Sequence, residues 1–271
     1  MRSTRFAEVA PSILAIAVLA VAGCGGARGS TIGGAGERVL VVFAAASLRE
    51  PVEAATAAYE ARNRGLAIRV AYASSTALRV QIEEGAPADL FLSADVANPV
   101  RLEAAGLTAA PPLPFAGNRL AIVVPAGREL VRTARDLAAE GVAVIAAGEG
   151  VPITGYAEQL VGRLGALPGY PTDFAARYAA NVVSREDDGA AVVAKIGFGE
   201  GDAAIAYATD AARTPGVETI ELPADVEVVA TYAAVVIEGS RGAAEGRAFL
   251  EWLAGPAGMV VFDAAGFTAP P

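Results

Sequence analysis

The sequence predicts an α/β fold with mostly parallel sheets. Short apolar runs alternate almost throughout the chain with segments whose apolar residues recur at helical spacing. The runs are apolar at nearly every position, as expected of strands covered on both faces, and the periodic segments are typical of crossover helices. Repeated strand–helix–strand units of this kind form parallel sheets between layers of helices.

The elements follow one another in a regular order. An apolar strand at 39–43 leads into a helix that carries Val52 and Tyr59, and a strand ending near Tyr72 leads into a helix that carries Leu78 and Ile82. A later helix carries Tyr156, Leu160 and Leu164. Further strands are expected at 90–94, 120–124, 142–146 and 203–207.

Two stretches suggest crossings between two lobes. A proline-rich stretch at 111–114 precedes the strand at 120–124, and a long β-rich run covers 226–237. Helices around Phe249 and Phe262 would then return to the first lobe. The predicted first lobe comprises 38–117 and 226–271, and the second comprises 118–225.

The N-terminal residues have the features of an export signal. Arg2 and Arg5 precede a short apolar run at 13–22, and residues 21–24 resemble the lipobox that lipoprotein signal peptidase cleaves before a cysteine. We therefore expect a signal peptide at 1–23, a lipid on Cys24, and a flexible Gly- and Ser-rich tether at 24–37. The alternatives are an ordinary signal peptide ending near a chance cysteine, or an uncleaved anchor. Cys24 is the only cysteine, so it can form no intramolecular disulfide.

Composition narrows the classes of function. The chain has no histidine, which removes the commonest general base and most zinc sites. Its carboxylates, including Asp187 and Asp188, show no spacing that marks an acid–base pair, so we expect neither an enzyme nor a cofactor. The formal net charge of −9 disfavours nucleic acid as a partner. No segment after the leader is apolar enough to cross a membrane.

What remains is a set of helix starts that could bind a small anion. Ser47 and the pair Ser74 and Ser75 each stand where a strand gives way to a helix, and further helix starts are expected at 151–156 and 188–189. Free backbone N–H groups at such starts attract anions. Taken singly, Ser47 could instead form a capping box with Glu50, and Ser74 or Ser75 could be a plain N-cap.

The combined set supplies hydrogen-bond donors only. Ser47, Ser75, the backbone amides near Ile153 and Gly189, and the Tyr207 hydroxyl would form a ring of donors, provided that Asp187 and Asp188 point away. An anion that is fully ionised at neutral pH needs donors alone, whereas hydrogen phosphate also needs an acceptor. The ring therefore favours a tetrahedral dianion.

Several motifs, in order from about 39 to 267, resemble the molybdate-binding proteins of bacterial ABC importers. They are FAAASL, SSTALRVQIEEGAPADLFLSAD, NRLAIVVP, VPITGYA, GEGDAAIAYATDA and the final GF. The resemblance implies a type II periplasmic-binding-protein fold, in which two lobes joined by a two-strand hinge close over the ligand. It also implies delivery of the oxyanion to a membrane permease driven by an ATPase.

The resemblance assigns roles to individual residues. Ser47 matches the first serine ligand of the family, Ser75 the second (with Ser74 as an adjacent rival), and Tyr207 the tyrosine whose hydroxyl reaches the anion. The other two contacts are backbone N–H groups, here near Ile153 and at Gly189. The chain departs from the usual pattern at both, with Ile153-Thr154 in place of Ala-Gly and with Gly189 in place of valine; Thr154 is a further candidate donor. Molybdenum would be bound only as the oxyanion, without direct protein–metal ligands.

We therefore expect a monomeric, lipid-anchored, extracytoplasmic protein that binds molybdate, and tungstate as well. The nearest alternative is a binding protein for sulfate or another tetrahedral oxyanion. An enzyme on the same two-lobed scaffold and a structural lipoprotein whose serines are only helix caps are the others.

Overall fold

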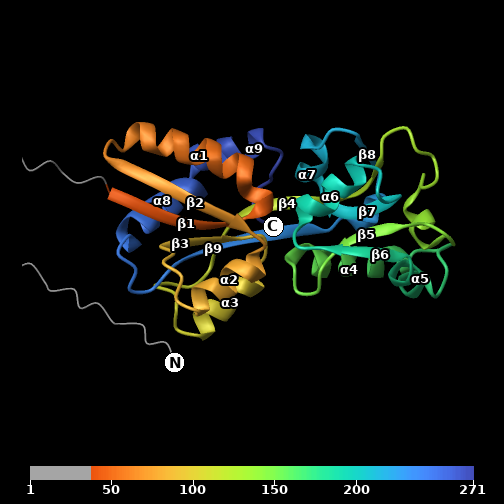
Figure 1. The fold of residues 1–271 in the computed structure, drawn as a ribbon, viewed down its shortest axis with the longest axis horizontal. Coiled ribbons are helices and arrows are strands. Elements are labelled where there is room, and N and C mark those ends of the chain that lie inside the picture. The colour runs from red at the N-terminus through yellow and green to blue at the C-terminus, as the bar shows by residue number, and fades with distance from the viewer. Residues whose placement is uncertain (1–37) are drawn as a thin grey trace, which may run out of the picture. The chain divides into compact units, whose positions relative to one another are not determined.

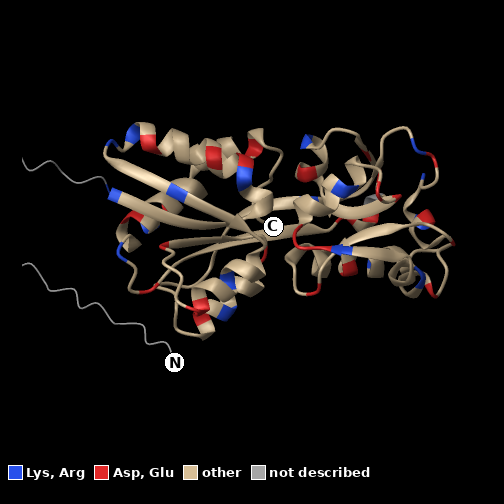
Figure 2. Ribbon diagram, viewed as in Figure 1, with Lys and Arg blue, Asp and Glu red and all other residues tan. Residues whose placement is uncertain are grey.

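The computed structural model describes residues 38–271. The predicted signal peptide, the tether and Cys24 lie outside the described residues. Within 38–271, no helix is both long and apolar enough to cross a membrane. Lys and Arg positions are interspersed with Asp and Glu positions over the whole described region (Figure 2).

The first lobe is built on a sheet whose inner strands run parallel. β1 (Arg38–Ala45) lies between β2 (Leu66–Ala73) and β3 (Leu90–Ser93) and is parallel to both. Alternate residues of these strands face opposite layers of helices, as the pleat requires. Its helices, drawn in Figure 1, are α1 (Arg49–Arg62), α2 (Ser75–Glu83), α3 (Ala97–Ala104), α8 (Ala243–Ala254) and α9 (Pro256–Ala264).

Two separate apolar clusters show this layering. Leu40, Val42 and Leu90 pack in the large cluster that includes Val52 of α1 and Phe249 of α8. Phe43 and Phe91, one position along each strand, pack instead with side chains of α2 and α3. The apolar runs are therefore buried on both faces, which confirms the interpretation of the sequence.

The second lobe is also built on a sheet whose inner strands run parallel. β5 (Val144–Ala147) lies between β6 (Val182–Glu186) and β7 (Ala203–Tyr207) and is parallel to both. β8 (Val217–Ile220) pairs antiparallel with the end of β4. Its helices are α4 (Pro152–Gly165), α5 (Phe174–Ala180), α6 (Gly189–Gly197) and α7 (Ala208–Arg213).

Two long strands connect the lobes. β4 (Leu113–Pro125) pairs with β9 (Val229–Val236) through its first half and with β7 and β8 through its second half, while β9 also pairs with β3. Within 38–271, every antiparallel pairing between named strands involves β4 or β9, and both strands run between the two sheets (Figure 1). This arrangement confirms the two-lobed fold with a two-strand hinge. The lobe boundaries between 117 and 118 and between 225 and 226 stay predictions.

The first strand that crosses between the lobes begins earlier than the sequence predicts. The prolines were expected to precede the strand, but β4 already begins at Leu113 and includes Pro114, with an irregular register between Pro114 and Ala116. Within the first sheet this half of β4 is an edge strand beside β9. A proline is tolerated there because an edge strand does not need every N–H for pairing.

The topology brings many helix starts together. In each lobe the helices that follow parallel strands begin at the carboxyl edge of the sheet: α1, α2 and α3 in the first lobe, and α4, α6 and α7 in the second. Ligands of open α/β sheets bind beyond this edge.

Candidate anion-binding site

A small pocket lies where the carboxyl ends of the strands meet. It is lined by residues at or just after the ends of β1, β2, β3, β5, β6 and β7. Every residue of the predicted donor ring is among them. The wall is formed by Ala45, Ala46, Ser47, Ser74, Ser75, Ala94, Val151, Pro152, Ile153, Asp188, Gly189 and Tyr207.

The pocket suits a small ion rather than an organic molecule. Its volume is about 20 Å³, which is close to the space that one water molecule needs. A larger cavity of about 210 Å³ lies between α4, α5 and the second sheet, but alanine and valine form much of its wall. That cavity lacks the convergent helix starts, so the small pocket is the better candidate.

Ser47 reaches the pocket from a short 3-10 turn, Ala46–Leu48, that precedes α1. Its buried hydroxyl shares a hydrogen bond of 2.9 Å with the Tyr232 hydroxyl of β9. The capping box with Glu50 is not formed, because the turn shifts the N-cap of α1 to Leu48. The Glu50 carboxylate instead contacts Arg213 at 3.1 Å.

The two neighbouring serines have different partners. Ser74 is the N-cap of α2, and its Oγ accepts the N–H of Ala77 at 3.3 Å. Ser75 is only 1% exposed, and its Oγ accepts the N–H of Ala94 at 3.0 Å. Because this bond uses a lone pair of Ser75, the hydroxyl proton is left to donate to a ligand. The geometry thus favours Ser75 as the donor and Ser74 as the cap.

The second lobe contributes the starts of α4 and α6. Pro152 occupies the first turn of α4, where its missing N–H costs nothing, and the N–H of Ile153 follows at a helix start. Thr154 does not add a donor to the pocket wall: its hydroxyl donates to the Gly148 carbonyl at 2.8 Å. A Cβ on Gly189 would lie 3.3 Å from the Tyr207 ring, so glycine lets this ring pack against the start of α6.

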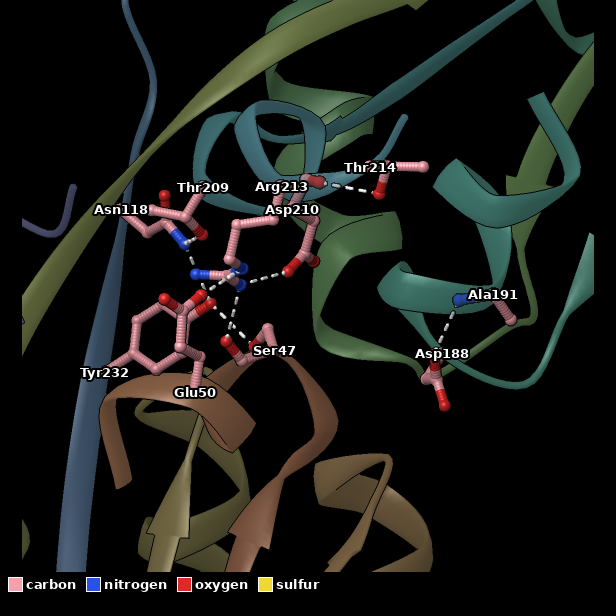
Figure 3. A network of polar contacts seen from close by, with 10 residues as sticks. All are labelled: Ser47, Glu50, Asn118, Asp188, Ala191, Thr209, Asp210, Arg213, Thr214 and Tyr232. Atoms are coloured by element: carbon pink, nitrogen blue, oxygen red, sulfur yellow. Dashed lines mark hydrogen bonds and ion pairs between the residues drawn. The ribbon is translucent and has the colours of Figure 1, made fainter. Parts of the chain in front are cut away.

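Asp187 and Asp188 are placed differently with respect to the pocket. Asp187 is absent from the pocket wall, but Asp188 is part of it. Asp188 is the N-cap of α6, and its Oδ1 accepts the N–H of Ala191 at 2.9 Å (Figure 3). A carboxylate at this helix start is stabilised by the same free amides that would attract an anion. This carboxylate is thus used by its own helix, and the expectation that Asp187 and Asp188 point away from the pocket stays a prediction.

Tyr207 carries the clearest sign of a missing acceptor. The side chain is 2% exposed, and within 38–271 its hydroxyl has no hydrogen-bond partner. Burial, aided by neighbouring Tyr232, Tyr156 and Asp210, raises the pKa of Tyr207 well above its ordinary value. The phenol stays protonated and remains a donor. Buried polar groups are rarely left unpaired, so this hydroxyl is suited to a ligand oxygen.

A polar network behind the pocket escaped the sequence analysis (Figure 3). Asn118 of β4 donates to the hydroxyls of Thr209 at 2.9 Å and Tyr232 at 3.3 Å. Burial, opposed by the Arg213 guanidinium, raises the pKa of Asp210 to about 7. No local pattern marks these residues, because their partners come from distant parts of the chain.

Comparison with known proteins finds matches over most of the chain. Residues 40–268 match the family described as bacterial extracellular solute-binding protein. The chain is 32% identical over 237 residues to the molybdate-binding protein ModA of Mycobacterium tuberculosis, covering 87% of this chain and 86% of that one.

Two solved structures share the fold. The periplasmic molybdate-binding protein of Azotobacter vinelandii has a TM-score of 0.70 at 23% identity, over 86% of this chain and 100% of that one. The sulfate-binding protein SubI of Mycobacterium tuberculosis has a TM-score of 0.74 at 23% identity, over 86% and 87%.

Proposed function

Because the chain belongs to the bacterial extracellular solute-binding proteins, we propose that it captures molybdate outside the cytoplasm for an ABC importer. The relative that carries this assignment is 32% identical and is named for molybdate binding. The family is one of binding proteins, which agrees with the expectation that the chain has no catalytic role.

The observation that carries the proposal is a pocket lined by hydroxyl-bearing residues and helix starts. Its wall contains Ser47, Ser75 and Tyr207 and the starts of α4 and α6, but neither Lys nor Arg. Each helix start carries roughly half a positive charge, so such a site can attract a dianion without a fixed cation. The small volume restricts the ligand to a compact ion.

Lobe closure would complete the site. Ser47 and Ser75 belong to the first lobe, and Ile153, Gly189 and Tyr207 belong to the second. An anion held by both sets makes more contacts when the lobes are together, and this difference shifts the population toward the closed state. β4 and β9 would bend as the lobes approach.

The proposal also includes a second ligand and the attachment of the protein to a membrane. Tungstate has the same charge and tetrahedral shape as molybdate, so we include it as a ligand. The lipobox-like residues 21–24 support a lipid anchor on Cys24. The lipid-anchored monomer would pass its bound anion to a membrane permease driven by an ATPase.

Sulfate is the second candidate, because the pocket is small and sulfate is the smaller dianion. Phosphate also belongs in the test, because a ring of donors alone disfavours an anion that still carries a proton. The purified protein is titrated with molybdate, tungstate, sulfate and phosphate by calorimetry and thermal unfolding. A ligand at 100 times its dissociation constant should add about 2.7 kcal/mol to the free energy of unfolding. A clear response to sulfate, with none to molybdate or tungstate, would overturn the proposal.

A further inference from the structure

One arginine joins the lobes beside the pocket. Arg213, at the end of α7 in the second lobe, donates from Nη2 to the backbone carbonyl of Ser47 at 3.3 Å. Its Nε lies 3.1 Å from Oε2 of Glu50 in α1. Both contacts cross from one lobe to the other, and Figure 3 shows them converging on the guanidinium.

The arginine is held in place by its own lobe. Asp210, one helical turn earlier, is 5% exposed, and its Oδ1 lies 2.8 Å from Nη2 of Arg213. This contact with a buried side chain holds the guanidinium beside α7. Whether Arg213 also reaches Ser47 and Glu50 then depends on how close the lobes are.

The contact between Arg213 and Glu50 is accessible to solvent, so it can break when the lobes move apart. The Arg213 side chain is 28% exposed and that of Glu50 is 60% exposed. Both line a groove of about 220 Å³ that lies next to the small pocket and shares Ala46 with it. Arg213 is absent from the wall of the small pocket itself.

We propose that Arg213 is a positioning residue for anion capture, which latches the second lobe onto Ser47 and Glu50 of the first when the lobes close. The inference rests on the proposed function. A contact made only in the closed state favours that state, so it slows the release of a bound anion. Its bond to the Ser47 carbonyl also steadies a residue of the pocket wall. Arginine suits this role because separate nitrogens of its planar fork reach the partners, Nη2 contacting Asp210 and Ser47 and Nε contacting Glu50, whereas lysine has a single nitrogen.

The experiment compares Arg213→Met, Arg213→Lys and Glu50→Gln with the unaltered protein. Affinity for molybdate, tungstate and sulfate is measured by calorimetry, and release after dilution is followed by elemental analysis. Arg213→Met should weaken binding about tenfold, mainly through faster release, because it removes hydrogen bonds to charged and carbonyl partners. Arg213→Lys should retain part of the affinity, and Glu50→Gln should lose a smaller factor.

A matched control lies in the same lobe. Arg177 of α5 forms an exposed pair with Asp173 at 2.8 Å, and Arg177→Met removes the same charge far from the interface. It should leave affinity and release unchanged.

The two variants change the net charge in opposite directions, which distinguishes a latch between the lobes from simple electrostatic attraction of the anion. Arg213→Met removes a positive charge and Glu50→Gln removes a negative one, yet a latch requires both to weaken binding. Tighter binding by Glu50→Gln, or unchanged affinity and release in both variants, would overturn the inference. Glu50 is exposed, so Glu50→Gln decides the matter even if Arg213→Met fails to fold.

A readout without ligand keeps the inference apart from the proposed function. If the unaltered protein binds none of the anions, the proposed function fails. The latch is then tested by small-angle scattering of the ligand-free protein. Arg213→Met should enlarge the radius of gyration relative to the unaltered protein and to Arg177→Met, and equal radii would overturn the latch.

Discussion

Two buried tyrosines should respond in opposite ways to the loss of a hydroxyl. The rings of Tyr207 and Tyr232 lie 5.7 Å apart, and both side chains are buried. The Tyr232 hydroxyl bonds to Ser47 at 2.9 Å and to Asn118 at 3.3 Å, whereas that of Tyr207 has no partner within 38–271. The changes Tyr207→Phe and Tyr232→Phe remove the same atom from two different surroundings.

The expected magnitudes follow from these contacts. Tyr232→Phe breaks two hydrogen bonds and leaves the Ser47 hydroxyl without that partner, so it should lower the free energy of unfolding by about 1–3 kcal/mol. Tyr207→Phe removes a buried donor that bonds to nothing, so the ligand-free protein should be as stable as before or more stable by about 1 kcal/mol. If this hydroxyl donates to the anion, the variant loses about 1.5–3 kcal/mol of binding, or roughly 10- to 150-fold in Kd.

The assay pairs urea unfolding in anion-free buffer with calorimetric titration of molybdate. The informative result for Tyr207→Phe is weaker binding together with undiminished stability. The reasoning is refuted if Tyr207→Phe destabilises the ligand-free protein as much as Tyr232→Phe does. It is also refuted if Tyr207→Phe leaves the affinity unchanged.

Three further predictions address the other parts of the site. Ser75→Ala should weaken anion binding about tenfold, as measured by calorimetry. Ser74→Ala should lower the free energy of unfolding by about 1 kcal/mol, because an N-cap is lost, and should change the affinity little. Equal losses of affinity in the two variants would contradict this. The pKa of Asp210 is raised in the folded protein from 3.8 to about 7, so its contribution to stability is present at low pH and is lost as pH rises from about 4 to about 7. Urea unfolding at pH 5 and pH 8 should show a smaller difference in the free energy of unfolding for Asp210→Asn than for the unaltered protein. An unchanged difference would contradict the assignment of this pH dependence to Asp210. Gly189→Val should press on the Tyr207 ring, which a Cβ already approaches to 3.3 Å, and so weaken binding; calorimetry showing full affinity would mean that the ring can move freely.

Much of the fold could be predicted because the signals are local. The strand at 203–207 and the helices that carry Tyr59, Ile82 and Leu164 appear where the apolar pattern places them. The start of β4 was missed because Pro114 signals a break locally, while the edge position of the strand tolerates it. The capping box at Ser47 was wrong for a similar reason, since a 3-10 turn shifts the N-cap by one residue.

The sequence by itself determined the alternation of strands and helices and the serines and glycine at the helix starts. Apolar periodicity and helix-start chemistry depend on neighbours along the chain, so they can be recognised without a structure. Only the tertiary structure decided that Ser75 and Ser74 have different partners, that Asp188 lies in the wall, and that the Tyr207 hydroxyl is buried without a partner. The partners of Ser47 lie 185 positions away in Tyr232 and 166 positions away in Arg213. Burial and hydrogen bonding between such distant residues arise only when the lobes pack, and no local pattern encodes that packing.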